Sequence, residues 1–361
     1  MTTSAPPPGL QAPARRLRAA VVGAGYWGPN LARNFRSSGA WELAAVCDLD
    51  LARAVALAEG GALATDDLAD VLDRADVDVV AIATPAHTHQ VIAEAALRAG
   101  KHVLVEKPLA HTRAAGESMV RLAAEHDLVL MADHTYCYTP AVLAIRDMVA
   151  AGDLGEILFV DSVRINLGLV QPDVDVFWDL APHDLSILDF VLPGGLRPES
   201  VSAHGADPLG AGRSCVGYLA LPLPGGAMAH VHVNWLSPTK IRRMVVGGTR
   251  RTLVWDDLNP QQRLSVYDRG VDLTQQSVDA VDRTTSQISY RLGDTWAPAL
   301  PEHEPLRAMI TELADSIHAR RDPRTGGAAG LRVLGVLEAA SASLAVGGAP
   351  VPVGERTLES V

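Results

Sequence analysis

The sequence predicts an α/β protein in two parts: a doubly wound parallel sheet, then an open, mostly antiparallel sheet covered by helices on one face. Three observations lead to this prediction. A glycine-rich turn, Gly23 to Gly28, lies between a short apolar run and a helical pattern. Short apolar runs then alternate with amphipathic helical patterns as far as residue 132. Beyond Pro140, strand-like stretches follow one another, and turns separate most of them.

The first part alternates strands and helices. We expect strands at residues 18–23, 41–47, 78–83, 103–106 and 128–132. We expect helices at about 28–38, 66–73, 87–99, 112–126 and 141–151. Gly100 and Gly152 end two of these helices, because glycine readily adopts the left-handed conformation found there.

The second part reads as a large sheet with a helical layer. Its expected strands are residues 157–166, 200–205, 215–221, 228–235, 242–247, 252–255 and 264–267. Its expected helices are residues 182–192, 304–320 and 330–346, and the polar span 274–301 reads as a long loop. The predicted organisation is a disordered arm at 1–16, a first domain at 17–136, and a second domain at 137–361.

Composition excludes several function classes. The 361-residue chain carries a net charge of −11, which argues against a nucleic-acid or anionic membrane surface. No uninterrupted apolar run reaches the roughly 18 residues that a membrane helix needs. The start, Met1 to Pro13, lacks the apolar segment of a signal peptide. Three cysteines without paired spacing indicate neither a disulfide framework nor a metal site, and a reducing cytoplasm is the expected location.

The glycine turn has the context of a dinucleotide site, with a strand before it, a helix after it, and Asp48 twenty residues beyond Gly28. In this reading Gly23 makes the tight turn, Gly25 admits a pyrophosphate, and Gly28 allows close packing of helix on strand. Asp48 would bind the ribose hydroxyls, which favours NAD. NADP stays possible if Arg53 swings in, and a turn without any ligand is the simpler alternative.

Lys107 is the first candidate for chemistry. It follows an apolar strand in Glu106-Lys107-Pro108, and ligands of parallel sheets lie at that strand end. Only three of the 31 basic residues are lysines. Lysine, unlike arginine, shifts its pKa readily when buried, so a lysine here suggests a titratable ammonium. The alternative is an ordinary exposed lysine at a strand end.

His183 is the second candidate. We expect Pro182 in the first turn of a helix, with His183 at the exposed mouth of that helix and Asp179 four residues earlier. The helix N-terminus would disfavour a charged imidazole, which suits a general base near neutral pH. Asp184 either contacts substrate or serves as a helix N-terminal charge. His230 and His232 share one face of a strand, and we interpret them as sheet residues, without a metal site.

Taken together, these motifs resemble the Gfo/Idh/MocA family of sugar and inositol oxidoreductases. The matching stretches are Gly23-x-Gly25-x-x-Gly28, Thr84-Pro85-x-x-x-His89, Glu106-Lys107-Pro108 and Asp179-x-x-x-His183. The resemblance implies an N-terminal Rossmann domain, a C-terminal α+β domain with an open sheet, and a catalytic triad of Lys107, Asp179 and His183. It further implies a Lys-Pro peptide that is often cis. The implied cofactor-binding residues are Gly23, Gly25, Tyr26, Trp27, Gly28, Asp48, Thr84, Pro85, His89, Glu106 and Lys107.

A subgroup of that family shares His134-Thr135-x-x-Tyr138-x-Pro140 and Arg164-x-Asn166 with this sequence. The subgroup is associated with nucleotide-sugar pathways, including oxidation of the 3-hydroxyl of UDP-N-acetylglucosamine. Tyr138, Arg164, Asn166 and Asp184 are therefore candidate substrate contacts. Arg164 could pair with a diphosphate, or could be an exposed strand arginine.

The sequence thus predicts an NAD(P)-dependent oxidoreductase that moves a hydride between nicotinamide and a secondary hydroxyl or ketone of a sugar, with a nucleotide sugar favoured. Alternatives are an inositol, free-sugar or secondary-metabolite sugar dehydrogenase, an NADPH ketoreductase, an NAD-assisted eliminating glycosidase, and a non-catalytic regulator that binds NAD and sugar. The resemblance also implies a homodimer or homotetramer formed through the C-terminal sheet.

Overall fold

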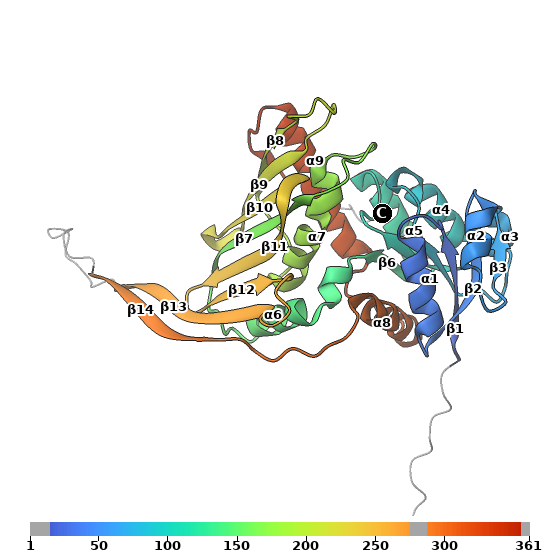
Figure 1. The fold of residues 1–361 in the computed structure, drawn as a ribbon, viewed down its shortest axis with the longest axis horizontal. Coiled ribbons are helices and arrows are strands. Elements are labelled where there is room, and N and C mark those ends of the chain that lie inside the picture. The colour runs from blue at the N-terminus through green and yellow to red at the C-terminus, as the bar shows by residue number, and fades with distance from the viewer. Residues whose placement is uncertain (1–14, 275–286, 355–361) are drawn as a thin grey trace, which may run out of the picture.

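The computed structural model describes residues 15–274 and 287–354, and most of the predicted N-terminal arm lies outside them. The first part of the chain forms a six-stranded parallel sheet in the order β3-β2-β1-β4-β5-β6 (Figure 1). Its strands are β1 (Leu17–Val22), β2 (Trp41–Cys47), β3 (Leu63–Thr65), β4 (Val79–Ile82), β5 (His102–Glu106) and β6 (Leu130–Asp133). Its helices are α1 (Gly28–Ser37), α2 (Leu51–Leu57), α3 (Leu68–Leu72), α4 (His89–Arg98) and α5 (Arg113–Glu125), with a 3-10 turn η1 (Ala86–Thr88).

The predicted alternation of strands and helices is confirmed, and α2 and β3 are additions to it. Central strand β4 is a short, fully buried run of valine, alanine and isoleucine, as expected for a strand covered on both faces. Helices α4 and α5 pack on one face of the sheet. The other face is covered by α1 together with α8 (Pro305–Ala319), a helix from the far end of the chain. The parallel sheet therefore borrows a helix from the predicted second domain.

The second part forms a nine-stranded sheet in the order β14-β13-β12-β11-β7-β10-β9-β8-β15. Only the β7–β10 pair is parallel among the described pairs, so the sheet is mostly antiparallel, as predicted. Its strands are β7 (Ile157–Leu167), β8 (Ser200–Ala206), β9 (Val216–Pro222), β10 (Met228–Asn234), β11 (Leu236–Gly248), β12 (Thr252–Asp256), β13 (Leu264–Thr274), β14 (Gln287–Trp296) and β15 (Val351–Pro352). Strand β14 lies where a loop was expected, which corrects that prediction.

The remaining helices join the two sheets. They are α6 (Pro140–Ala150), α7 (Val176–Val191) and α9 (Gly327–Ala345), with 3-10 turns η2 (Thr135–Tyr138) and η3 (Pro224–Gly226). Helix α9 packs against α5, α7 and β8, so it lies between the sheets (Figure 1). By length and mean hydropathy α9 resembles a membrane span, but it includes Arg332 and Glu338, and half of it is buried in the fold. Among the described helices no other passes that test.

Candidate active site

The glycine turn lies at the carboxyl edge of the parallel sheet, between β1 and α1. Gly23 has a φ of +97°, and a Cβ there would come 2.6 Å from the carbonyl oxygen of Ala83. A Cβ on Gly28 would come 2.0 Å from the carbonyl oxygen of Gly23, whereas a Cβ on Gly25 would meet nothing within 4 Å. Gly23 and Gly28 are therefore required by the close packing of the turn, which leaves no room for a side chain at either position. Gly25 leaves backbone open to a ligand, as a pyrophosphate requires.

Asp48 connects the end of β2 to this turn. Its carboxylate accepts hydrogen bonds from the Ala24 N–H at 2.6 Å and from the Asp50 N–H at 2.9 Å, and the side chain stays partly exposed. Arg53 pairs with Asp50 instead, with 3.2 Å between Nε and Oδ2. The negative charge of Asp48 is therefore not offset by Arg53, which suits an unphosphorylated ribose and disfavours a 2′-phosphate.

The two aromatic residues inside the turn, Tyr26 and Trp27, lie in different surroundings. Tyr26 is 93% exposed at the sheet edge. Trp27 donates its Nε1–H to Oδ2 of Asp133, 2.6 Å away, at the end of β6. The Thr135 hydroxyl donates to the other oxygen of Asp133. Trp27 thus fastens the glycine turn to β6 and is partly exposed, whereas the ring of Tyr26 is open to a ligand.

Thr84 and Pro85 follow β4 at the same edge and keep exposed surface, but His89 does not. His89 is 1% exposed, with Nδ1 3.0 Å from the Pro108 carbonyl oxygen and Nε2 2.8 Å from the Thr84 carbonyl oxygen. Its burial corrects the expectation of a direct cofactor contact. His89 holds together the two loops that follow β4 and β5.

Lys107 directly follows β5, and the Lys107–Pro108 peptide is cis. Glu106 pairs in register with Asp133 on β6, so two carboxyl groups lie side by side at this edge. Burial first, and the neighbouring Asp133 carboxylate second, raise the pKa of Glu106 well above its ordinary value. The Lys107 side chain retains 16% exposure. A partly hydrated ammonium therefore lies beside a carboxyl group that holds its proton more tightly than usual.

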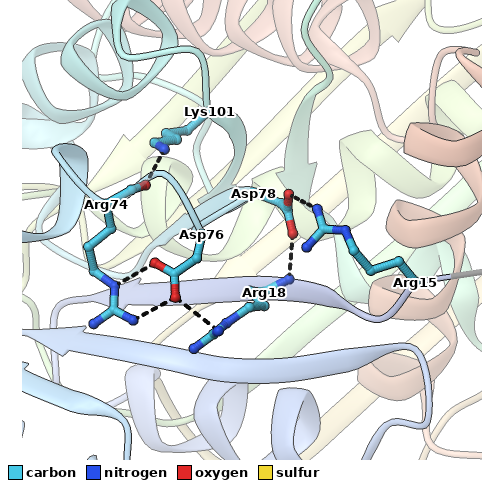
Figure 2. Close-up of polar contacts among 6 residues, drawn as sticks. All are labelled: Arg15, Arg18, Arg74, Asp76, Asp78 and Lys101. Atoms are coloured by element: carbon cyan, nitrogen blue, oxygen red, sulfur yellow. Dashed lines mark hydrogen bonds and ion pairs between the residues drawn. The ribbon is translucent and has the colours of Figure 1, made fainter.

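Lys101, at the opposite end of β5, has a structural role. Its ammonium donates to the Arg74 carbonyl oxygen at 2.6 Å (Figure 2). Around it, Arg74 and Arg18 pair with Asp76, and Asp78 accepts from the Arg18 N–H (Figure 2). This network joins the amino ends of β1, β4 and β5, away from the carboxyl edge where Lys107 lies.

Helix α7 starts earlier than expected. Asp175 caps it by accepting from the N–H groups of Phe177 and Trp178, and Val176 is its first residue. Pro182 lies inside the helix, so His183 is two turns from the N-terminus and does not lie at the helix mouth. Asp179 and His183 are instead neighbours at i and i+4 on one helix face.

Lys107 and Asp179 meet across the two parts of the molecule. The Lys107 ammonium donates to the Asp179 carbonyl oxygen at 2.9 Å and to its Oδ1 at 3.2 Å. The indole of buried Trp235 donates to Oδ2 of Asp179 at 2.9 Å. Both carboxylate oxygens therefore have a donor, and the ammonium is held against the start of α7.

His183 lies against Tyr136, edge to face, with 5.1 Å between the ring centroids. Burial first, then the positive charges of Lys107 and Arg164, lower the pKa of His183 well below its ordinary value. This replaces the helix-terminus effect expected from the sequence. The imidazole is neutral at pH 7, which is the form that a general base needs.

Two predicted substrate contacts pair with each other instead. Arg164 donates from Nε and Nη2 to Asp184, at 2.6 and 3.2 Å, and the Ser162 hydroxyl donates to Asp184 at 2.8 Å. Both charged side chains are at most 3% exposed. Neither has a free charge for substrate. The Arg164 guanidinium lies 4.4 Å from the centre of the Tyr136 ring and supports it against His183.

The prediction of Tyr138 as a substrate contact is also not supported by its position. It is 1% exposed, its hydroxyl lies 3.2 Å from the Thr325 hydroxyl, and Arg324 stacks on its ring. It packs in the core beneath α8, and Tyr136 of the same 3-10 turn occupies the site in its place. Asn166, near the end of β7, is partly exposed and stays a candidate.

Sequence reasoning missed Arg242 of β11. It pairs in register with Arg164 of β7, so both side chains lie on the same face of the sheet. Its side chain is 32% exposed, 5.8 Å from the Tyr136 ring and 3.5 Å from an Asp257 oxygen. The alternation of side chains along β11 was the signal in the sequence that could have placed Arg242 on this face. Other residues missed at the site are Tyr136, Trp235 and Trp255, and the sequence showed His134 only as part of a motif, without a role.

His230 and His232 lie on the other, open face of the sheet. The His230 ring lies 3.2 Å from the Asp161 carboxylate, and the His232 ring stacks on Tyr218 with 4.3 Å between centroids. Across the described ranges, no group of three or more His, Cys, Asp or Glu side chains is arranged to hold a metal ion.

A parallel sheet with this glycine turn, and an acidic residue after its second strand, defines the class of dinucleotide-binding oxidoreductases. The NAD-binding Rossmann model of the GFO/IDH/MocA oxidoreductase family matches residues 17–134, and the C-terminal domain model of the same family matches residues 142–254. The chain belongs to this family of NAD-binding oxidoreductases. Relatives of this chain include named dehydrogenases and reductases, and one that is named a hydratase.

Several relatives are dehydrogenases or reductases of sugars. UDP-N-acetylglucosamine 3-dehydrogenase of Acidithiobacillus ferrooxidans is 29% identical over 88% of this chain and 94% of its own. Its structure has a TM-score of 0.77 at 26% identity, covering 92% of this chain and 99% of that one. A dTDP-3,4-didehydro-2,6-dideoxy-alpha-D-glucose 3-reductase of Streptomyces violaceoruber is 40% identical, but over only 45% of this chain and 50% of its own. At 24% identity and a TM-score of 0.79, GenD2 in complex with NAD shares the fold.

Proposed function

We propose that this enzyme transfers a hydride between NAD and a secondary hydroxyl group of a sugar, or the corresponding ketone, and that the sugar is carried on a nucleotide. The observation that carries the proposal is the meeting of Lys107, Asp179 and His183 at the carboxyl edge of the parallel sheet. Bound NAD supplies the hydride acceptor at that edge.

His183 is proposed as the base. Its neutral imidazole takes the hydroxyl proton as the carbinol carbon loses its hydride. Lys107 donates a hydrogen bond to the same oxygen and stabilises the negative charge that develops on it. Asp179 touches Lys107 and shows no hydrogen bond to His183, so we assign it to orienting the ammonium.

The residues that would hold NAD fit its chemistry. The open backbone at Gly25 suits the pyrophosphate, and the Asp48 carboxylate suits the ribose hydroxyls. Tyr26, Thr84 and Pro85 have exposed surface at the same edge. Glu106 is proposed to position Lys107 and the nicotinamide.

The nucleotide-sugar assignment is supported by the long match to the UDP-N-acetylglucosamine 3-dehydrogenase and by Arg242. The Arg242 guanidinium pairs with Asp257 at 3.5 Å, but unlike Arg164 it is one-third exposed, next to the ring that supports His183, so it can also reach a substrate phosphate.

A free sugar or glycoside is the second candidate. Arg164, the expected diphosphate partner, is neutralised by Asp184. A relative named D-glucoside 3-dehydrogenase, from Escherichia coli, is 33% identical over 55% of this chain.

We also propose that a second copy covers the open face of the nine-stranded sheet. That face presents partly exposed aromatic side chains, including Phe159 and Tyr218. Light scattering on the purified protein should give at least twice the monomer mass, and a monomer would exclude this assembly.

The three cysteines are unpaired and buried, which supports a reducing, cytoplasmic location.

The experiment is a substrate panel read at the reduced-nicotinamide absorbance band. UDP- and dTDP-sugars, free sugars, glycosides and inositols are each mixed with enzyme and NAD, and the matching keto-sugars with NADH. A nucleotide sugar should give the highest kcat/KM. A glycoside that reacts better would select the second candidate. Silence in both directions, with NAD binding demonstrated, would refute sugar oxidoreduction and favour a regulatory role.

A further inference from the structure

His134 lies directly beside the proposed reaction centre. It follows β6 just as Lys107 follows β5, and the residues before them, Asp133 and Glu106, pair in register. His134 is 1% exposed, and neither of its ring nitrogens has a hydrogen-bond partner among the described residues. A buried polar group without a hydrogen-bond partner destabilises the folded state. Such a group at a catalytic centre calls for an explanation.

A third unpartnered nitrogen lies nearby. Nδ1 of His183 is also enclosed and makes no hydrogen bond to a described residue. Tyr136, two residues after His134, contacts the His183 ring, so the segment that carries His134 passes next to that ring. The two imidazoles therefore share one buried polar region at the ends of β5 and β6.

The proposed reaction specifies where the hydrogen on His183 must be. A neutral imidazole carries one N–H, and Nε2 can accept the substrate proton only if that hydrogen is on Nδ1. The buried Nδ1–H then needs an acceptor. The charged neighbours Lys107, Arg164 and Arg242 can only donate, and each Asp179 oxygen already accepts one hydrogen bond, from Lys107 or from Trp235. Among the charged and imidazole groups that act on His183, His134 is the one whose enclosed nitrogens have no partner among the described residues.

We propose that His134 is a positioning residue: one buried water accepts the Nδ1–H of His183 and donates to a ring nitrogen of His134, which keeps Nε2 of His183 free for the substrate. This inference rests on the proposed function, in which His183 is the base. Burial and the charge of Lys107 lower the pKa of His134 to about 4, so the ring is neutral and has an acceptor nitrogen at pH 7. A buried site with several polar groups around it is suited to an ordered water.

The test reads the tautomer of His183 directly and needs no substrate. Protein labelled with 15N-histidine is examined by long-range 1H–15N NMR at pH 7, and His183→Asn assigns the resonance. The wild type should show the Nδ1–H tautomer. His134→Leu should shift His183 toward the Nε2–H tautomer, and either His134→Asn or His134→Gln, which keep an acceptor, should restore it.

His232→Leu is the matched control, because His232 also has an enclosed, unpartnered ring nitrogen but lies on the open face of the far sheet. It should leave the His183 signals unchanged. A wild-type Nε2–H tautomer would overturn the proposal, even if His134→Leu failed to fold. An unchanged Nδ1–H tautomer in folded His134→Leu would overturn it equally. Because NAD and sugar are absent from this experiment, its outcome is independent of the substrate panel.

Discussion

Replacing Lys107 with methionine removes the ammonium and keeps most of the side-chain volume. The ammonium makes two contacts with Asp179, and we propose that it also binds the reacting oxygen. Loss of one preorganised donor to a developing oxyanion lowers turnover roughly 100- to 1000-fold. We expect a loss of that size in kcat for sugar oxidation.

The fold and the cofactor site should tolerate this change. The Asp179 carboxylate keeps its hydrogen bond from Trp235 and remains 19% exposed, so it is not left as an isolated buried charge. The loss in unfolding free energy should not exceed about 3 kcal/mol. Affinity for NADH, measured by fluorescence titration, should stay within about threefold because the glycine turn and Asp48 are untouched.

Lys101→Met is the matched control, since it removes a buried ammonium from the other end of β5 (Figure 2). It should lower stability and leave kcat at 25 °C nearly unchanged. Near-normal turnover in folded Lys107→Met would refute the role of this lysine. Equal losses of turnover in both variants would assign the effect to the strand and not to the site.

Further predictions concern the cofactor turn, acid stability and substrate charge. Gly28→Ala should destabilise the fold, because its Cβ would lie 2.0 Å from the Gly23 carbonyl oxygen, whereas Gly25→Ala should keep wild-type urea stability and lose NADH affinity. The pKa of His134 is lowered to about 4 from 6.5, so the unfolded chain binds this proton first as the pH falls. Between pH 6.5 and pH 4 the wild type should therefore lose about 3 kcal/mol of unfolding free energy relative to His134→Leu, and the difference between the two proteins should stay constant above pH 7. The free energies are measured by urea unfolding at each pH, and curves of free energy against pH that run parallel for the two proteins would contradict this prediction. Arg242→Gln should raise KM for a nucleotide sugar roughly tenfold or more and leave KM for a simple glycoside unchanged, as steady-state kinetics will show.

Local signals in the sequence predicted the parallel sheet and the position of the glycine turn correctly. The positions of these features depend on neighbours in the chain: Gly23 to Gly28 lie between a strand and a helix, and Asp48 follows the next strand. Strand-end positions such as Lys107 follow from the same alternation. These features are set by backbone geometry within short segments, so they can be read before the fold is known.

Pairings between distant segments were not accessible from the sequence. The start of α7 was also wrong for a local reason: Pro182 suggested a helix start, but Asp175 caps the helix seven residues earlier and the helix continues through the proline. Arg164 and Asp184 both read as substrate contacts because nothing in the sequence indicated that they neutralise each other. The choice of Tyr136 over Tyr138 depends on which side of a 3-10 turn faces α8.

The most direct test of hydride transfer from sugar to nicotinamide follows one labelled hydrogen. The sugar that reacts best in the panel is prepared with deuterium on the carbon that is oxidised, and is mixed with enzyme and NAD. Mass spectrometry should find the deuterium in the reduced nicotinamide, one per ketone formed, and roughly 100- to 1000-fold slower transfer with Lys107→Met. Deuterium that remains in the sugar product or passes to water would contradict the proposed function.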